Sequence, residues 1–366
     1  MQGLTYFKLI FLNISLFILN NPLHPMFFLR YKRKLINMKK VKSVLWIFLS
    51  AALSTGFIAC EDEDETYPVT PVTPPSGLTQ NIAEIAIADS RTDSFVVALT
   101  EANLVSTFTG TTNYTVFAPD NQAFEDLLAT NSAWNRISDI DATTLTNALL
   151  YHVAEGKVMA SALTDDTYVT TLNTQGSVDK ENTVIEVDIT GGARLNNASN
   201  IDAVDFEATN GVIHIIDAVL LPQNIVEIAL DDERFTSLVA ALSVFGDTLT
   251  GALSGNGPFT VFAPTNAAFQ ALLDSDSTWN SLNDIPRSTL NTVLRYHIVP
   301  SINAQASQIR QDQNLPTLSN LNLQIDLTSG VQLITRSMAQ GNVSIIVPDV
   351  QGTNGVIHAV ESVLLP

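Results

Sequence analysis

Histidine is the residue type in this chain with the clearest capacity for chemistry, and four of its five copies lie in repeated surroundings. Two follow tyrosines and two lie inside apolar runs. A metal site would need these rings to converge with carboxylates or thiolates, yet the sequence has no HExxH, CxxC or EF-hand pattern. A histidine among Val, Ile and Leu is more often a core residue with hydrogen-bonded ring nitrogens. We favour that role over a ligand or catalytic role for His152, His297, His214 and His358.

Motifs for catalysis are missing from the sequence. There is no glycine-rich phosphate loop and no GxSxG turn, and spacing singles out no carboxylate pair among the 37 acidic residues. We interpret Asp165-Asp166 and Asp231-Asp232-Glu233 as solvated charges in loops or at helix starts. Trp134 and Trp279 follow amphipathic segments, so we expect them to pack on a core or a loop rather than on sugars. The sequence therefore predicts no enzyme, no cofactor and no metal site.

The histidines belong to a long internal repeat with a period of about 144 residues. That period is too long for a solenoid unit and matches the common size of a whole domain, so we expect two tandem copies of one domain. The repeated segments are NIAEIA at Asn81 and NIVEIA at Asn224, YTVFAPDNQAF at Tyr114 and FTVFAPTNAAF at Phe259, LLYHVAEG at Leu149 and LRYHIVPS at Leu294, and TNGVIHIIDAVLLP at Thr209 and TNGVIHAVESVLLP at Thr353.

The YTVFAPDNQAF segment predicts a buried strand, a proline turn and a helix. Val116 and Phe117 have β-branched and aromatic side chains that suit a buried strand, and Pro119 ends the ladder. Asp120, matched by Thr265, is expected to cap the helix that follows. Apolar residues then recur with helical spacing, which predicts one inward-facing stripe in each copy.

Other segments carry clear signals for helices and strands. Helical spacing runs from Asn81 to Glu101, with a break near Asp89, and from Asn224 through Leu242. Shorter helices are predicted at Ala142 to Tyr151 and Ser288 to Tyr296. The later part of each half is rich in strands, and Asn-Gly turns at Asn210 and Asn354 precede a closing strand. The strand segments are TYVTTL, NTVIEVDI and GARLNN in the first half and NLQIDL, GVQLIT and VSIIV in the second.

Three ordered motifs, each present twice, resemble the fasciclin (FAS1, beta-Ig-H3) family. They are VFAP-[DT]-N-x-A-F, then Tyr-His, then TNGVIH-x-[IV]-[DE]-x-VLLP, and they cover about residues 78 to 366. The resemblance implies an α+β fold in which each of two tandem domains is a wedge of two small β-sheets packed with several helices. It also implies a usual role in extracellular adhesion or ligand binding.

The resemblance further implies candidate contact residues. In animal members of the family, integrin recognition involves the Tyr-His segment and an Asp-Ile pair before the closing strand. At the second place this chain keeps the aspartate and lacks the isoleucine. A structural role is the alternative, because an Asp before a turn commonly bonds nearby backbone amides. The candidate residues are Tyr151, His152, Asp205, Tyr296, His297 and Asp349.

Charge is distributed unevenly along the chain. Eight basic residues and no acidic ones precede Cys60, so the remainder carries 10 basic against 37 acidic residues, a formal net charge of −27. Such a field disfavours nucleic acid and anionic lipid as partners. A solvated acidic surface is the simpler interpretation, and an acidic site for cations is the alternative.

Residues 38 to 59 have the three parts of a secretory signal peptide, namely a lysine-rich start, an apolar run and small residues before Cys60. Phe57-Ile58-Ala59-Cys60 resembles a bacterial lipobox, and no second thiol exists for pairing, so we favour lipidation of Cys60 over a reactive thiol. Residues 1 to 37 then precede a complete signal. We interpret them as a mis-called upstream extension, with a membrane-anchoring helix as the alternative.

Residues 60 to 77 are interpreted as an acidic and Pro/Thr-rich tether. The run Glu61 to Glu65 resembles the surface-export signal of Bacteroidetes lipoproteins, and a charged spacer is the alternative. The extended tether would reach roughly 50 Å. Fasciclin-like domains are expected at 78 to 222 and 223 to 366, and their short connection, Gln223, predicts a fairly fixed relation between them.

These observations favour a non-enzymatic adhesion or interaction lipoprotein, tethered to the outer membrane and exposed at the cell surface. Its partners would be an extracellular protein or glycan, and the membrane through the N-terminal lipid. The alternative is an accessory lipoprotein that binds a glycan or nutrient for an outer-membrane uptake system. An enzyme ranks third, because it would need a catalytic arrangement that the sequence does not show.

Overall fold

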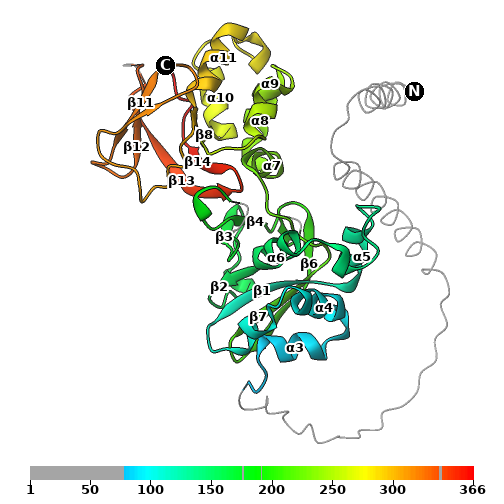
Figure 1. The fold of residues 1–366 in the computed structure, drawn as a ribbon. Coiled ribbons are helices and arrows are strands. Elements are labelled where there is room, and N and C mark those ends of the chain that lie inside the picture. The colour runs from blue at the N-terminus through cyan, green and yellow to red at the C-terminus, as the bar shows by residue number, and fades with distance from the viewer. Residues whose placement is uncertain (1–77, 175–176, 191, 338–339) are drawn as a thin grey trace, which may run out of the picture. The chain divides into compact units, whose positions relative to one another are not determined.

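The computed structural model describes residues 78–174, 177–190, 192–337 and 340–366. The predictions for the upstream extension, the signal peptide, Cys60 and the tether lie outside these residues. Within them, each half of the chain begins with helices and continues into a sheet (Figure 1).

The first domain has four α-helices and seven strands among the described residues. Its helices are α3 (Ile82–Ala88), α4 (Asp93–Glu101), α5 (Asn121–Leu128) and α6 (Ala142–Tyr151). Its strands are β1 (Tyr114–Pro119), β2 (Val153–Glu155), β3 (Thr167–Thr170), β4 (Val184–Asp188), β5 (Arg194–Leu195), β6 (Ser199–Ala208) and β7 (Gly211–Ile216).

The second domain repeats this order with one more helix. Its helices are α7 (Ile225–Asp231), α8 (Thr236–Ser243), α9 (Asp247–Leu253), α10 (Asn266–Asp274) and α11 (Arg287–Tyr296). Its strands are β8 (Phe259–Pro264), β9 (Ile298–Pro300), β10 (Asn314–Pro316), β11 (Asn322–Asp326), β12 (Gln332–Ile334), β13 (Asn342–Gly352) and β14 (Gly355–Val360).

Both sheets have the same topology. The strand order is β2-β1-β7-β6-β5-β4-β3 in the first domain, and it returns as β9-β8-β14-β13-β12-β11-β10 in the second. In each sheet the VFAP strand pairs in parallel with the closing strand, and the other described pairs are antiparallel. The long strands β6 and β13 each carry two register shifts and join the two portions of their sheet. The predicted α+β fold with two tandem domains is therefore confirmed, but the strands of each domain form one seven-stranded sheet rather than two separate small sheets, because the long strand β6 or β13 pairs with both portions.

Local capping explains where the helices begin. Asp120 and Thr265 accept hydrogen bonds from the amides of Ala123 and Ala268, as the sequence predicts for the caps of α5 and α10. Asn81 forms a capping box at the start of α3. The helical segment after it is interrupted, as expected, by a 3₁₀ turn between α3 and α4.

Each sheet is buried on both faces. Along β1, Val116 and Ala118 pack into a core formed with the helices, whereas Phe117 packs into a second core with Ile185 and Leu195. This alternation follows the two-residue period of a strand, and burial on both faces accounts for the nearly continuous apolar sequence. The second domain repeats the pattern. Trp134 and Trp279 are half-buried and pack against the helix-side cores, as predicted.

A buried asparagine connects the first helix of each domain to its closing hairpin. The Asn210 Oδ1 accepts from the Ile82 amide at 2.8 Å, and its Nδ2 donates to the carbonyls of Phe108 and Gly110. Asn354 makes the equivalent three bonds in the second domain. The next residue must be glycine, because a Cβ on Gly211 would lie 1.9 Å from the Tyr114 carbonyl oxygen.

The histidine after each repeated tyrosine, Tyr151 or Tyr296, connects a helix end to the segment after the closing strand. The His152 Nδ1 donates to the Ala148 carbonyl at 2.6 Å, and its Nε2 accepts from the Leu220 amide at 2.9 Å. His297 has the same arrangement with Val293 and Leu364. Both rings are buried and neutral in this arrangement, and burial lowers the pKa of each to about 4. These contacts support the structural role that the sequence predicts for His152 and His297.

Replacing Asn210 with alanine should destabilise the protein by about 3 kcal/mol, because one buried amide and two carbonyls lose their partner. Asn131→Ala is a control, since this exposed side chain bonds only the Ala133 amide among its described partners, and it should cost about 0.5 kcal/mol. Urea unfolding followed by tryptophan fluorescence measures both. Equal losses in the two variants would contradict the proposed role of Asn210.

Because His297 is buried and neutral, the free energy of unfolding should depend on pH. An unfolded histidine has a pKa of about 6.5, whereas burial lowers the folded value to about 4. The contribution of the neutral ring to the free energy of unfolding is therefore complete above pH 6.5. It decreases by about 3 kcal/mol as the pH falls to 4. Urea unfolding of the wild type and His297→Gln between pH 7.5 and 4 should show a shrinking stability difference. A constant difference would be inconsistent with a neutral buried ring.

Candidate functional site

The two tyrosines proposed as contact residues are buried. Tyr151 and Tyr296 end α6 and α11 and have no exposed surface. The Tyr151 hydroxyl donates to the Val184 carbonyl at 2.6 Å and accepts from the Asn196 Nδ2 at 2.9 Å. Tyr296 donates to the Asn322 carbonyl at 3.2 Å. Burial raises the pKa of both phenols. Together with His152 and His297, these side chains connect helices to the sheet and are not part of the surface.

The two candidate aspartates lie at the surface, in the bulges of β6 and β13. Asp205 and Asp349 have φ angles of 63° and 58°, in the left-handed region that aspartate tolerates better than most residues. Each carboxylate accepts a distant amide, from Ala160 at 2.8 Å and from Ala306 at 2.7 Å, rather than the nearby amides expected from the sequence. The bulge turns these carboxylates toward loops far away in sequence.

A buried histidine supports each of these bulges. The His214 Nδ1 accepts from the Asp205 amide at 3.3 Å, and its Nε2 donates to the Val158 carbonyl at 2.9 Å. His358 makes the same bonds to Asp349 and Ala304. Burial lowers the pKa of both rings. The aspartate side chains remain 33% and 37% exposed, so they are the candidates that can contact a partner.

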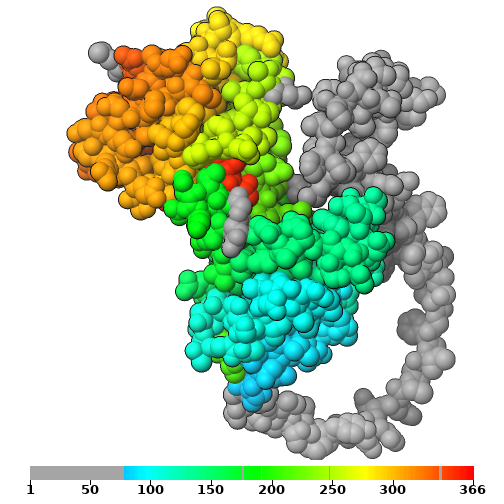
Figure 2. Space-filling model, in the orientation of Figure 1, coloured from blue at the N-terminus to red at the C-terminus, as the bar shows by residue number. Residues whose placement is uncertain are grey.

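A second group of polar residues, which the sequence did not reveal, lies where the first domain meets the second. In β4, Ile185 and Val187 face the first domain's own core, whereas Val184 packs into the second domain's helix-side core. By the two-residue period of a strand, Glu186 faces the same way as Val184. Figure 2 shows the green segment that contains β3 and β4 against the red closing hairpin, where the Val178 amide donates to the Thr353 carbonyl.

An aspartate–arginine pair of the second domain lies beneath this covering segment. The Arg234 guanidinium donates to both oxygens of Asp232, at 2.8 to 3.1 Å. The Tyr168 hydroxyl of β3 donates to the same carboxylate at 2.5 Å, and the guanidinium lies 5.3 Å from the centroid of the tyrosine ring. Arg234 also donates to the Asp166 carbonyl at 2.9 Å. These contacts join the two domains directly.

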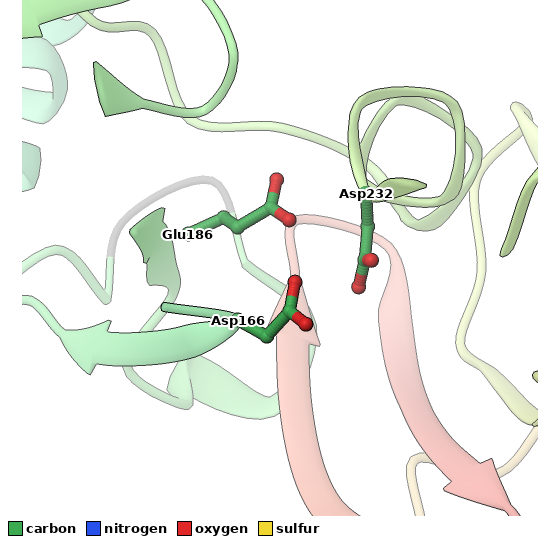
Figure 3. Close-up of side chains that lie close together, drawn as sticks. All are labelled: Asp166, Glu186 and Asp232. Carbon is green, nitrogen blue, oxygen red and sulfur yellow. The ribbon is translucent and has the colours of Figure 1, made fainter. Parts of the chain in front are cut away.

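Three carboxylates converge at this junction (Figure 3). One oxygen from each of Asp166, Glu186 and Asp232 lies within 4.8 Å of the others. Burial raises the pKa of Glu186 to about 8, and the negative charge of Asp232 contributes. Our interpretation of Asp231-Asp232-Glu233 as solvated was wrong for Asp232, which is 1% exposed. Asp232 does begin a short helix, as expected, but the first domain covers it.

The chain offers no evident catalytic arrangement among the described residues. Two of its hollows are shallow, and two titratable side chains, Glu155 and Tyr168, both line the same one. The hollow beside the junction is lined by uncharged residues, most of them polar or glycine, including Ser177, Asn224 and Thr353. Neither hollow pairs a nucleophile with a base. No helix in the described part of the chain is both long and apolar enough to cross a membrane.

Comparisons with known proteins also divide the chain into two similar domains. The model of the fasciclin domain family matches residues 90–222 and again 233–366. Pig transforming growth factor-beta-induced protein ig-h3 is 29% identical over 259 residues, which cover 70% of this chain and 35% of that protein. Human periostin is 26% identical over 278 residues, covering 70% of this chain and 29% of periostin. This chain thus spans about a third of the length of these two relatives.

A smaller relative matches a single domain. The uncharacterized protein sll1735 of Synechocystis sp. is 37% identical over 142 residues, which cover 39% of this chain and 97% of that protein. A solved FAS1 domain pair from the insect cell adhesion molecule fasciclin I aligns with a TM-score of 0.48 and 18% identity, covering 76% of this chain and 97% of that structure. Because the family model matches most of the chain in two consecutive stretches, the protein belongs to the fasciclin domain family and contains two tandem FAS1 domains.

Proposed function

We propose that this protein is a non-enzymatic interaction module that acts in adhesion. A protein-interaction or adhesion role is the one that its two fasciclin domains and its relatives support. The observation that carries the proposal is the duplication of a complete domain, including the partly exposed bulge aspartate with the same support in each copy. Two equivalent faces on one chain strengthen binding when each single contact is weak.

The proposed binding face centres on Asp205 and Asp349. Both carboxylates are held by a backbone amide and a φ-positive bulge, so they are presented without much loss of side-chain freedom on binding. Each keeps about a third of its side-chain surface open to solvent. An extracellular protein with basic or amide groups would suit these acidic positions.

The proposed location is the outer face of a bacterial outer membrane. Lipidation of Cys60, followed by the acidic and proline-rich residues 60 to 77, would hold the domains away from the bilayer. Anchoring many copies at a surface would increase their effective concentration toward a facing cell or matrix. This arrangement suits an adhesion protein better than a free secreted one.

The alternative of a glycan-capturing lipoprotein has less support. Sugar-binding surfaces commonly use an exposed aromatic ring, and every aromatic side chain among the described residues is buried or half-buried. The large apolar side chains that are exposed are aliphatic: Leu78, Ile87, Val97, Ile189, Val204, Leu230 and Ile346. We therefore favour a protein partner.

Removing the charge from both bulges should weaken adhesion. Asparagine keeps an oxygen that can accept the same amide and tolerates positive φ, so Asp205→Asn and Asp349→Asn should preserve the fold. Beads coated with the protein would be tested on an array of immobilised matrix proteins and glycans. We expect each single variant to lose about threefold in bound beads and the double variant to lose tenfold or more, since the second contact supplies avidity.

A matched control uses two exposed aspartates that also have positive φ. Asp179 and Asp312, with φ angles of 57° and 60°, lie one in each domain outside the bulges. The double variant Asp179→Asn, Asp312→Asn removes the same charge and should bind as the wild type does. If both double variants bind equally, the bulge aspartates are not the contact surface. Binding to glycans alone would favour the uptake alternative.

Lipidation of Cys60 predicts a change in location. In a bacterial host that lipidates secreted proteins, the wild type should incorporate an alkyne-labelled fatty acid and fractionate with membranes. Cys60→Ser should lose the label and appear in soluble fractions, because it removes the chain's only thiol. Thr55→Ala, within the same leader, should behave as the wild type. A Cys60→Ser protein that stays labelled and membrane-bound would contradict the anchor.

A further inference from the structure

The carboxylates at the domain junction have the spacing of cation ligands. Oxygens of Asp166, Glu186 and Asp232 all lie within 4.8 Å of one another. Calcium binds oxygen at about 2.3–2.6 Å, so two ligands on opposite sides of the ion are separated by roughly this distance. Magnesium, at about 2.0–2.1 Å, usually keeps several water ligands and binds through one or two carboxylates. Three converging carboxylates within this limit are therefore more typical of an ion of calcium's size.

Glu186 gives an independent indication of a ligand. The residue is 5% exposed, and its carboxylate makes no hydrogen bond or ion pair with the described part of the chain. The neighbouring Asn196 side chain bonds the Glu186 backbone amide instead. Figure 3 shows the Glu186 side chain directed toward the space between Asp166 and Asp232. A buried carboxylate without a partner is costly, and a bound cation would remove that cost.

When all three carboxylates are ionised, the charges at the junction do not balance without a further cation. The single positive charge of Arg234 offsets one of the three negative charges. Its guanidinium donates to Asp232 and lies 3.9 Å from an oxygen of Asp166. Two negative charges remain when Asp166 and Glu186 are ionised, which a single divalent ion would neutralise. The half-exposed side chain of Asp166 leaves a path for the ion and for water ligands.

The repeat provides an internal comparison. Asp89 and Arg91 form the same pair in the first domain, with the guanidinium donating to both carboxylate oxygens. The position equivalent to Glu186 in β11 is Gln324. The repeated tyrosines Tyr151 and Tyr296 bond the carbonyls of Val184 and Asn322, which lie two residues earlier in each strand. The acidic group is therefore specific to the junction and not a property of the fold.

We propose that Asp166, Glu186 and Asp232 bind one divalent cation of calcium's size, which joins the first domain to the second. The ligands come from the segment before β3, from β4 and from the start of the short helix Glu233–Phe235. The ion would stabilise the contact between domains and hold the two bulge aspartates in a fixed relation. The nearby Arg234 charge weakens the attraction, so we expect a dissociation constant of about 10⁻⁴ to 10⁻³ M, in the range of extracellular calcium modules.

Terbium and calcium test this proposal on the purified protein in 0.15 M NaCl. Terbium replaces calcium in oxygen sites and emits when a nearby tyrosine is excited, and the Tyr168 hydroxyl bonds the Asp232 carboxylate directly. We expect tyrosine-sensitised emission that calcium competes away with a stoichiometry of one. Calcium at 5 mM should raise the Tm by about 3 °C relative to EDTA.

Two variants and one control separate a built site from general attraction to an acidic protein. Glu186→Gln introduces the residue type found at Gln324, and Asp166→Asn changes a half-exposed side chain at positive φ, so both should fold. Each should reduce the sensitised emission at least tenfold and abolish the calcium-dependent Tm shift. Asp89→Asn, which alters the equivalent pair in the first domain, should retain both signals.

The proposal would be overturned if the wild type showed neither signal. It would also be overturned if Glu186→Gln retained both signals with an unchanged circular dichroism spectrum, or if Asp89→Asn lost them equally. In those cases any calcium response would reflect the overall negative charge of the domains.

Discussion

Each domain depends on one parallel pair of buried strands, β1 with β7 and β8 with β14. Parallel strands that are neighbours in a sheet need a long connection, and here that connection contains most of the domain. Both faces of the pair are covered, so its side chains form two cores instead of one. The helices and the antiparallel strands are therefore held in place by a pairing that forms only when distant segments meet.

Polar side chains secure the two ends of this pair. Asn210 and Gly211 fix its start, where the backbones approach too closely for any Cβ. His152 fixes its far end, because one ring bonds both the last turn of α6 and the segment after β7. The same residue types serve both domains, which explains why the longest repeated motifs include residues that at first suggest chemistry. The polar side chains of these residues form hydrogen bonds that hold the fold together.

The sequence predicted the parts of the fold that depend on local signals. Caps, proline turns and helical spacing placed α5 and α6 correctly, because each involves residues a few positions apart. The bulged strand β6 was not predicted, since its two register shifts break the alternation that marks a strand. The short strands β2 and β9 were also missed, because three residues carry too little pattern.

For the candidate sites, too, the sequence identified some residues, whereas their exposure is evident only from the structure. The sequence and the family resemblance identified Tyr151 and Asp205 together, but only the structure shows that the first is buried and the second partly exposed. Glu186 occupies a polar place in an alternating strand, which normally indicates solvent. It is buried because a different domain covers that face, and no spacing within the chain encodes such a contact.

At the junction, side chains of the first domain form part of the core of the second domain. Tyr168 and Val184 complete the helix-side core of the second domain while belonging to strands of the first. Such shared packing disfavours independent movement of the two copies. A chain with two binding faces in a fixed relation is suited to a partner that presents its own groups at a matching spacing.

Amide hydrogen exchange tests the central claim, that the buried parallel pair is the constraint on which each domain depends. The amides of β1, β7, β8 and β14 should exchange most slowly in their domains, at matching positions in the two copies, because opening them requires unfolding of both cores. Slower exchange in the antiparallel strands β3, β4, β10 and β11 than in these four strands would contradict the account.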